Sequence, residues 1–294
     1  MKKAKIFSLL AAAFLLFGLI AGCGTKAGGS QTAPAAPAAP AGQNGGQNNS
    51  SAQTITLKGI ADLVPHSEII EYVKPKLAQQ GIDLVLVSTA ADNTTNEKTA
   101  KGEIDFNYFQ HYPYLESWNE TNGFNLVNAG DIHVEPITAY SDKYESAEKI
   151  PDNAVVAIPN DGTNEYRALR ILEQNGFLKL NEDTATSLRA SLTDIKEFIR
   201  PLEIVELDSA QIIPTKDDYD FFITNTNKAL EAQITSTRLF SEGSDSPYAN
   251  IIAVREEDKD NPAVLALVKE LQSEDTRKFI NEKYNGAVIP AKLN

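Results

Sequence analysis

The sequence predicts an α/β fold in which parallel sheets are covered by helices. Two observations support this class: apolar residues switch repeatedly between strand-like and helical spacing, and the order strand, helix, strand occurs twice. A helix between two strands favours parallel pairing, because the chain must return to the same end of the sheet. The two units lie at residues 55–60, 65–81 and 82–87, and at 154–158, 163–174 and 202–207.

Each predicted helix has an apolar stripe and a start or stop signal. The first helix enters at Pro65 and Ser67 and stops at Gly81, and the second stops at Gly176. Their apolar stripes are Ile69, Ile70, Val73 and Leu77, and Ala168, Leu169, Ile171 and Leu172. Further strands are expected at 104–108, 219–223 and 248–255, and further helices at 262–272 and 276–284.

The second unit looks like a separate sheet, and no internal linker rich in proline or glycine separates it from the first. We therefore expect two lobes joined by short crossing segments. Ligands of open α/β sheets bind in the crevice outside the carboxyl ends of the strands. The polar clusters of this sequence lie at those strand ends, which makes the crevice the expected site.

Residues 1–22 have the order of a secretory signal peptide: a basic start, an apolar stretch from Ile6, and small residues before Cys23. The spacing resembles the bacterial lipobox, in which the cysteine is acylated and becomes the new N-terminus. Cys23 is therefore the expected lipidation site. A cleaved signal with an incidental cysteine and a true transmembrane helix are the alternatives, although residues 6–22 lie at or below the length of a span.

Residues 23–53 predict a disordered tether behind the lipidated cysteine. They are almost entirely Gly, Ala, Pro, Ser, Thr, Gln and Asn, and Lys26 is their only charge. The residues from Thr54 onward suffice for one large domain or two small lobes. Since Cys23 is the only cysteine, its acylation leaves the mature fold without a disulfide.

The charge balance argues against nucleic acid as a partner. The formal net charge is −13, and removal of three lysines with the signal peptide makes it −16. The aromatic residues are not interleaved with Lys or Arg runs, so a stacking platform for single strands is also unsupported. Acidity favours solubility at a surface.

An aromatic segment follows the predicted strand at 104–108. Phe109, His111, Tyr112 and Tyr114 place four rings within seven residues. Rings with polar tips suit a small amphipathic ligand. The alternative is a core patch at the start of a helix.

Arg167 is the main candidate for anion binding. It lies about one turn into the helix that follows the strand at 154–158, where free N–H groups should face the crevice. Its guanidinium can bind a carboxylate bidentately. Arg170 competes on an adjacent face, and the alternative for Arg167 is a surface pair with Glu165 or Glu173. The amides at 224–227 end another strand, although alone they are only a turn.

Catalytic and metal motifs are not found. The sequence contains no Gly-x-Ser-x-Gly elbow, no His-Glu-x-x-His helix and no Walker loop. His66, His111 and His133 do not pair at helical ligand spacing, so we expect no metal and no cofactor. The paired carboxylates, such as Glu103 and Asp105, read as surface charge. The prediction is a protein that is not an enzyme.

Five segments together resemble the methionine-binding lipoproteins, or NlpA lipoprotein family, from about Thr54 to the end. They read VPHSEI at 64–69, FQHYPYL at 109–115, IPNDGTNE at 158–165, IVELD at 204–208 and SPYAN at 246–250. The resemblance implies a two-lobed periplasmic-binding-protein fold of type II-like architecture, with mixed, mainly parallel sheets, helices on their faces and the ligand in the cleft. The implied lobes are residues 54–137 with 247–294, and residues 138–246.

The resemblance also implies site residues. Arg167 matches the arginine that binds the substrate carboxylate, with Asn164 beside it. Asn225 and Asn250 match family asparagines that contact the main-chain groups of the amino-acid ligand. The residues around the ligand side chain are matched by Phe109, His111 and Tyr114.

Three positions depart from the family pattern. Segment 91–96 reads ADNTTN, so that Asp92 stands in place of a pocket-wall tyrosine, with Asn96 at its end. Tyr166 replaces a customary glycine, and Lys228 replaces an aromatic residue. A carboxylate in place of a ring removes apolar contact worth about 1–3 kcal/mol for a thioether side chain. We therefore expect methionine or a related amino acid or short peptide, and a side chain more polar than that of methionine is one of the alternatives.

The predicted function is an extracytoplasmic solute-binding lipoprotein, a monomer anchored to the cell membrane by its N-terminal lipid. It would deliver methionine or a related amino acid to an ABC permease and ATPase complex. The alternative is a lipid-anchored surface protein that has kept the binding fold but serves adhesion or another role outside transport.

Overall fold

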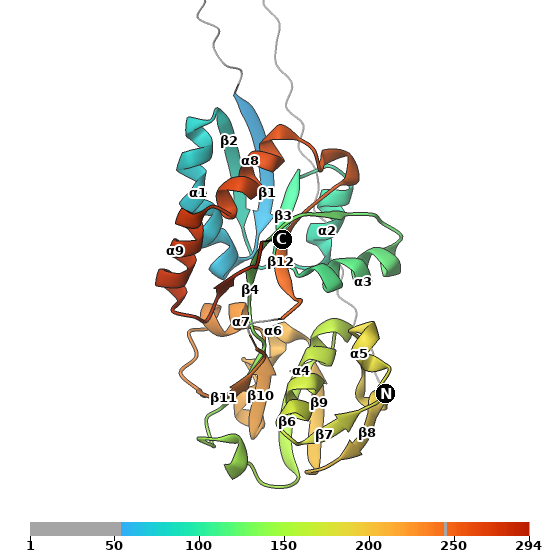
Figure 1. Ribbon diagram of the computed structural model, residues 1–294. Helices are drawn as coiled ribbons and strands as arrows, with labels where there is room; N and C mark the ends of the chain where they lie inside the picture. Colours follow the sequence, from blue (N-terminus) through green and yellow to red (C-terminus); the bar gives the residue numbers. More distant parts are fainter. Residues whose placement is uncertain (1–53, 244–245, 294) are drawn as a thin grey trace, which may run out of the picture. The chain divides into compact units, whose positions relative to one another are not determined.

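The computed structural model describes residues 54–243 and 246–293, with the side chain of Thr186 excepted, and they belong to one compact unit. The predicted signal peptide, Cys23 and the predicted tether lie outside the described residues. Figure 1 shows the arrangement of the helices and strands.

The described residues form thirteen strands: β1 (Ile55–Ala61), β2 (Ile82–Ser88), β3 (Phe106–Tyr108), β4 (Val127–Val134), β5 (Thr138–Ser141), β6 (Ala154–Pro159), β7 (Leu178–Leu180), β8 (Ile195–Phe198), β9 (Leu202–Leu207), β10 (Phe221–Thr224), β11 (Thr237–Ser241), β12 (Ala249–Val254) and β13 (Ile289–Pro290). They also form nine α-helices: α1 (Glu68–Gln79), α2 (Asn93–Ala100), α3 (Tyr112–Asn122), α4 (Gly162–Gln174), α5 (Thr184–Ser187), α6 (Ser209–Ile212), α7 (Thr226–Glu231), α8 (Pro262–Leu271) and α9 (Glu274–Tyr284). Short helical segments are η1 (Leu63–Ser67), η2 (Ala147–Lys149), η3 (Leu192–Asp194), η4 (Lys216–Asp218) and η5 (Glu256–Asp258).

The strands form two large mixed sheets and one small one. The first sheet has the order β13-β4-β12-β3-β1-β2, the second β11-β5-β10-β6-β9, and β7 pairs with β8. The predicted mixed α/β class is confirmed. The expectation of mainly parallel sheets is wrong, because parallel pairing is confined to β2-β1-β3 in the first sheet and to β9-β6-β10 in the second. Later strands return antiparallel and complete each sheet.

Helices cover both faces of the first sheet (Figure 1). Strand β12 shows why: Ile252 and Val254 pack into the core with α1, α8 and α9, whereas Ile251 and Ala253 pack with Leu115 of α3 on the other face. Successive side chains of a strand point to opposite faces, so a strand buried on both faces is apolar throughout. This explains the continuous apolar run of β12.

The second sheet is built in the same way. In β10, Phe221 and Ile223 pack with the apolar face of α4, whereas Phe222 packs with Ile212 of α6 and Ala229 of α7. The helix α4 starts directly after β6 and runs along one face of the sheet (Figure 1). Its first turn carries the candidate anion-binding residues to the carboxyl end of β6.

Glycine ends two helices where the sequence predicts. Gly81 follows α1 and Gly176 follows α4, both with positive φ values of 77° and 75°. This left-handed conformation is easily adopted by glycine because it has no Cβ. Both predicted stops are confirmed.

Within the described residues the chain passes between the two large sheets twice. The first crossing, 135–137, joins β4 to β5, and the second, 242–248, joins β11 to β12, with residues 244 and 245 outside the described residues. Strands β1–β4, β12 and β13 belong to one sheet, and β5, β6 and β9–β11 to the other. Since residues 51–294 form one compact unit, the predicted division into lobes at 137/138 and 246/247 stays a prediction.

Candidate ligand-binding site

The turn between β6 and α4 places Arg167 inside the protein. Asp161 caps α4, and its Oδ1 accepts a hydrogen bond of 3.0 Å from the backbone N–H of Asn164. Such a cap stabilises a helix start by satisfying a free N–H group. Arg167 follows one turn later and is only 2% exposed. A buried guanidinium needs partners for its five N–H donors, and their identity defines the site.

Carboxylate and carbonyl oxygens hold one side of this guanidinium. Nε and Nη2 of Arg167 donate to the two carboxylate oxygens of Glu242 at 3.3 and 2.5 Å, and Nη2 also donates to the Glu135 carbonyl at 2.8 Å. The guanidinium carbon lies 4.5 Å from the centre of the Tyr248 ring, within cation–π range. The alternative of a surface pair is wrong: Glu173 binds Arg170 instead.

Three donors converge on the side-chain oxygen of Asn164. Nη1 of Arg167 donates to this Oδ1 at 3.2 Å and Nδ2 of Asn225 at 2.9 Å, and Nε2 of His111 lies 3.3 Å from it. Arg167, Asn164, Asn225 and His111 are called the donor cluster below. The sequence predicted all four, and the fold brings them together from α4, from the start of α7 and from the start of α3.

His111 is a neutral donor in this cluster. It precedes α3, and its Nδ1 accepts a hydrogen bond of 3.1 Å from the backbone N–H of Tyr114. A neutral imidazole with an accepting Nδ1 carries its proton on Nε2, the atom that faces Asn164. Burial, with the nearby charge of Arg167, lowers the pKa of His111 to about 3. The ring is therefore uncharged at neutral pH.

Aromatic rings surround His111. Its ring centre lies 5.0 Å from that of Tyr248 and 6.1 Å from that of Tyr114, and Phe109 meets Tyr114 edge to face at 6.2 Å. The Tyr114 hydroxyl donates to Asn93 at 2.8 Å. Beside these rings lies a cavity of about 160 Å³ between α3 and the start of α4, lined by Asn93, Tyr114, Ser117, Trp118, Thr121, Asn122, Asp161, Gly162 and Thr163.

The remaining predicted site residues lie outside the donor cluster. Asn96 is fully buried and exchanges hydrogen bonds with Gln110 at 2.9 and 2.5 Å. Asp92 is exposed and caps α2, where its carboxylate accepts from the backbone and hydroxyl of Thr94. The Asn250 side chain lies 3.1 Å from Nε2 of His66. Their roles in ligand binding stay predictions.

The two other departures from the family pattern also have structural positions. Tyr166 is buried and belongs to the apolar core that packs around α4. Lys228 of α7 forms an ion pair of 3.3 Å with the buried Asp62, the residue that caps η1.

Sequence reasoning missed Glu242 and Glu135, the two residues that hold Arg167 from the crossings. Each is far from Arg167 in the chain, and neither belongs to a recognisable pattern. Tyr248 lies inside the SPYAN segment at 246–250. This segment supported the family resemblance, but it did not predict the contact of Tyr248 with the guanidinium.

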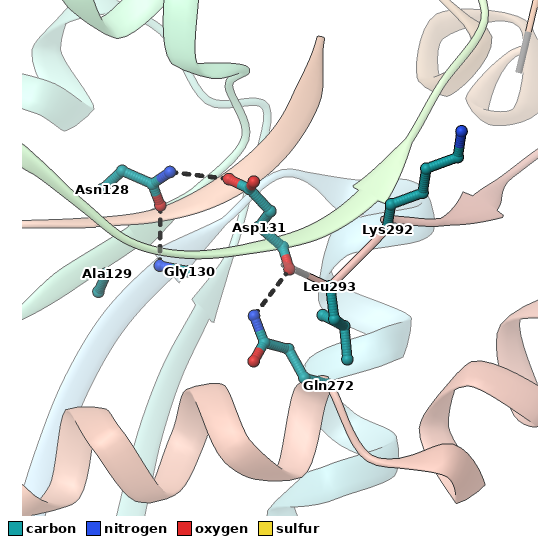
Figure 2. Close-up of a pocket in the computed structure, with 7 residues that line it drawn as sticks. All are labelled: Asn128, Ala129, Gly130, Asp131, Gln272, Lys292 and Leu293. Carbon is teal, nitrogen blue, oxygen red and sulfur yellow. Dashed lines mark hydrogen bonds between the residues drawn. The ribbon is translucent and has the colours of Figure 1, made fainter. Parts of the chain in front are cut away.

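A second, larger groove of about 250 Å³ lies along β4 and contains none of the predicted site residues (Figure 2). Asn128 donates to the Asp131 carboxylate at 2.7 Å, and Gln272 donates to the Asp131 carbonyl at 3.0 Å. These hydrogen bonds satisfy the polar groups of the groove internally. The residues that line this groove include no aromatic ring, so it is less suited to an amino acid than the region around the donor cluster.

The fold brings two of the three histidines together, which the spacing argument missed. Ligand atoms of His66, His133 and Glu135, all buried, lie within 4.8 Å of one another. The expectation that no metal site exists rested on spacing along a helix, whereas these residues come from η1, β4 and the first crossing. The three are called the acceptor cluster below.

These features define a two-lobed binding protein. Its two mixed sheets are connected by two segments of the chain, and a buried arginine and side-chain amides lie where segments of the two sheets meet. The chain belongs to the NlpA lipoprotein family, whose model matches residues 59–292. The predicted family and fold are thereby confirmed. Among the helices of the described residues, none combines the length and the apolar character that a bilayer crossing requires.

Known proteins resemble the chain over most of its length. It is 34% identical over 256 residues to the methionine-binding lipoprotein MetQ of Bacillus subtilis, covering 85% of this chain and 92% of that protein. A nutrient-binding protein from Burkholderia cenocepacia, solved bound to methionine, is 36% identical with a TM-score of 0.75, covering 80% and 100% of the two chains. An ABC transporter periplasmic substrate-binding protein from Coxiella burnetii is 33% identical with a TM-score of 0.74, covering 80% and 100%.

Proposed function

We propose that this protein is an extracytoplasmic solute-binding lipoprotein that delivers methionine or a closely related amino acid to an ABC importer. The donor cluster would bind the α-carboxylate, and the rings of Phe109, His111 and Tyr114 would contact the side chain. In this proposal the protein is a binding protein and not an enzyme. The three relatives described above are each named as binding proteins.

The convergence of three donors on one oxygen carries the proposal. The Asn164 Oδ1 marks a point that N–H groups of Arg167, Asn225 and His111 reach at once. A carboxylate oxygen at that point would form charge-assisted hydrogen bonds, which are about twice as strong as those to a neutral amide oxygen. A ligand carboxylate therefore has an energetic reason to displace the amide.

The guanidinium also keeps a donor for the ligand. Of its five N–H bonds, two point to Glu242, one to the Glu135 carbonyl and one to Asn164. The fifth N–H bond belongs to Nη1, the atom that also bonds Asn164. Glu242 and the Glu135 carbonyl thus fix the guanidinium, and the opposite edge presents its hydrogen atoms to a carboxylate.

The surroundings favour methionine itself over a more polar relative. The Asp92 carboxylate, which motivated the polar alternative, is exposed and bonded to Thr94 at the start of α2. The rings around His111 supply apolar contact, and sulfur packs favourably against aromatic rings. The Burkholderia relative was solved bound to methionine.

Lipidation at Cys23 would keep the protein at the outer face of the cell membrane, next to the permease and ATPase complex. Lipoprotein is part of the name of the Bacillus relative, and the Coxiella relative is named for an ABC transporter. Binding as a monomer belongs to the same proposal.

Calorimetry on the full chain in detergent, titrated with individual amino acids, tests this function. We expect heat with methionine and with few other amino acids. Arg167→Lys keeps the charge but loses the planar fork, so affinity should fall by about 10–100-fold, equivalent to about 1.4–2.8 kcal/mol. Arg170→Ala, a change on the same helix outside the cluster, should bind as the unmodified protein does. Heat with no amino acid, or full affinity in Arg167→Lys, would overturn the proposal.

A further inference from the structure

We propose that His66, His133 and Glu135 form a binding site for a divalent transition-metal ion of the zinc type, located behind the amino-acid site. Two imidazole nitrogens and one carboxylate oxygen are the ligand set of many zinc sites that keep a fourth position open. None of these three ligands comes from the donor cluster, so the proposal does not require the amino-acid ligand.

The ligand atoms already lie at distances suited to one ion. Oε1 of Glu135 is 2.7 Å from Nε2 of His133 and 3.5 Å from Nε2 of His66. Two ligands on a tetrahedral zinc ion, with bonds of about 2.0–2.1 Å, are about 3.3 Å apart. These two separations bracket this value, and all three ligand atoms lie within 4.8 Å of one another.

A fourth ligand is at hand. Oδ1 of Asn250 lies 3.1 Å from Nε2 of His66, which is also close to a tetrahedral edge. The amide oxygen of Asn250 or a water molecule would complete the coordination. Since Asn250 is also a predicted ligand contact, the ion would lie directly behind the amino-acid site.

Neighbouring groups orient the proposed ligands, as groups around a metal commonly do. The Tyr108 hydroxyl bonds Nδ1 of His133, and the backbone N–H of Asn227 donates to Oε2 of Glu135 at 2.9 Å. Nδ1 of His66 is buried and has no hydrogen-bond partner among the residues that the structure describes. The other ring nitrogen, Nε2, is the one that faces Glu135 and Asn250.

The charge of the site suits a cation. Glu135 is a buried carboxylate, and its proposed partners in the site are two imidazole rings, which carry no negative charge. The other buried carboxylate nearby, Asp62, is paired with Lys228 at 3.3 Å. A divalent ion would compensate the buried charge of Glu135.

Metal titration of the full chain, stripped with a chelator, tests the site. We expect one Zn²⁺ per chain in competition with a chromophoric chelator, and visible absorption bands of four-coordinate Co²⁺ when cobalt is used. X-ray absorption should detect two imidazole ligands. Mg²⁺ and Ca²⁺ should not compete, because they prefer oxygen ligands.

Variants separate this site from adventitious binding. His133→Gln and Glu135→Gln should weaken Zn²⁺ binding by more than about 100-fold, because loss of an outer-shell partner alone costs about 10–100-fold. Tyr108→Phe, which retains every ligand, should show that smaller loss. His111→Gln, another buried histidine change, should bind Zn²⁺ as the unmodified chain does.

Three outcomes would overturn the proposal: no saturable Zn²⁺ binding, six-coordinate Co²⁺ spectra, or equal binding by His133→Gln. If the variants fail to fold, the cobalt spectrum and X-ray absorption of the unmodified chain decide alone. Methionine binding by the metal-free chain would leave the proposed function intact, so the two proposals fail separately.

Discussion

This protein contains two buried polar clusters that are linked through Glu135, and their chemistry is opposite. In the donor cluster, N–H groups of Arg167, Asn225 and His111 point to the side-chain oxygen of Asn164. The acceptor cluster directs two imidazoles and a carboxylate toward another. One is complementary to an anion and the other to a cation. The sign of the ligand that each accepts therefore follows from the direction of its hydrogen bonds.

The two clusters share structural parts. Glu135 gives its carbonyl to Arg167 and its carboxylate to the acceptor cluster. At the start of α7, the Asn225 side chain donates to the donor cluster, whereas the backbone of Asn227 donates to Glu135. Substitutions at these neighbours can separate the roles.

The largest effect is expected for Glu242→Gln, which leaves the buried guanidinium of Arg167 without its ionic partner. Breaking a buried ion pair costs about 3–5 kcal/mol, and the 14% exposure of the Glu242 side chain puts our expectation near 3 kcal/mol. Urea unfolding measures the loss, and Glu173→Gln, which breaks a partly exposed pair on α4, should cost less than about 1 kcal/mol. Equal losses in both variants would show that the donor cluster is not organised by charge.

A smaller effect is expected from acid. The pKa of His111 is about 3 in the folded protein against 6.5 for the free group, so between these values the unfolded chain binds the extra proton. The stability present above pH 6.5 is therefore lost as the pH falls, by about 2 kcal/mol per histidine between pH 7 and pH 5. Unfolding at both pH values should show this loss reduced by that amount in His111→Gln.

His133→Gln is the matched test in the acceptor cluster, because burial lowers the pKa of His133 to about 3 as well. An unchanged acid loss in either variant would mean that the corresponding ring is already protonated in the folded protein.

Asn225→Ala and Asn227→Ala form the next pair. Loss of the Asn225 donor should weaken methionine binding by about tenfold, corresponding to about 1.4 kcal/mol for one hydrogen bond to a charged group. Asn227→Ala keeps the backbone N–H and loses only a side-chain bond to Asp62, so methionine affinity should not change. Calorimetry measures both, and a reversed order would contradict the assignment of the two asparagines.

The smallest effect is expected for Asp92→Ala. Loss of the cap at α2 should lower the free energy of unfolding by about 1 kcal/mol and leave methionine affinity unchanged. Thermal unfolding and calorimetry check the two parts. A clear change in affinity would return Asp92 to the pocket wall, where the family pattern suggested it.

The sequence predicted residues that act near their own element and missed those that act across the fold. The apolar stripes and glycine stops located α1 and α4, and the strand-to-helix turn indicated Arg167. Glu242 lies 75 residues from Arg167, and no local pattern records such a contact. The helix α2 was missed because its buried face consists of Thr95, Asn96 and Thr99, so it has no apolar periodicity.

The acceptor cluster was missed for the same reason. His66 and His133 come from η1 and β4, and only the folding of the first sheet brings them together. Ligand spacing along a helix describes one way to build a metal site, and tertiary proximity is another.

Arg167 also has a mechanical role. It bonds the carbonyl of Glu135 in the first crossing and the carboxylate of Glu242 in the second. A single side chain thus ties together both segments that connect the two large sheets. If the proposed function is correct, a ligand on this guanidinium would act on both connections at once, and a transporter that senses the arrangement of the two sheets would register the bound amino acid as a change of shape.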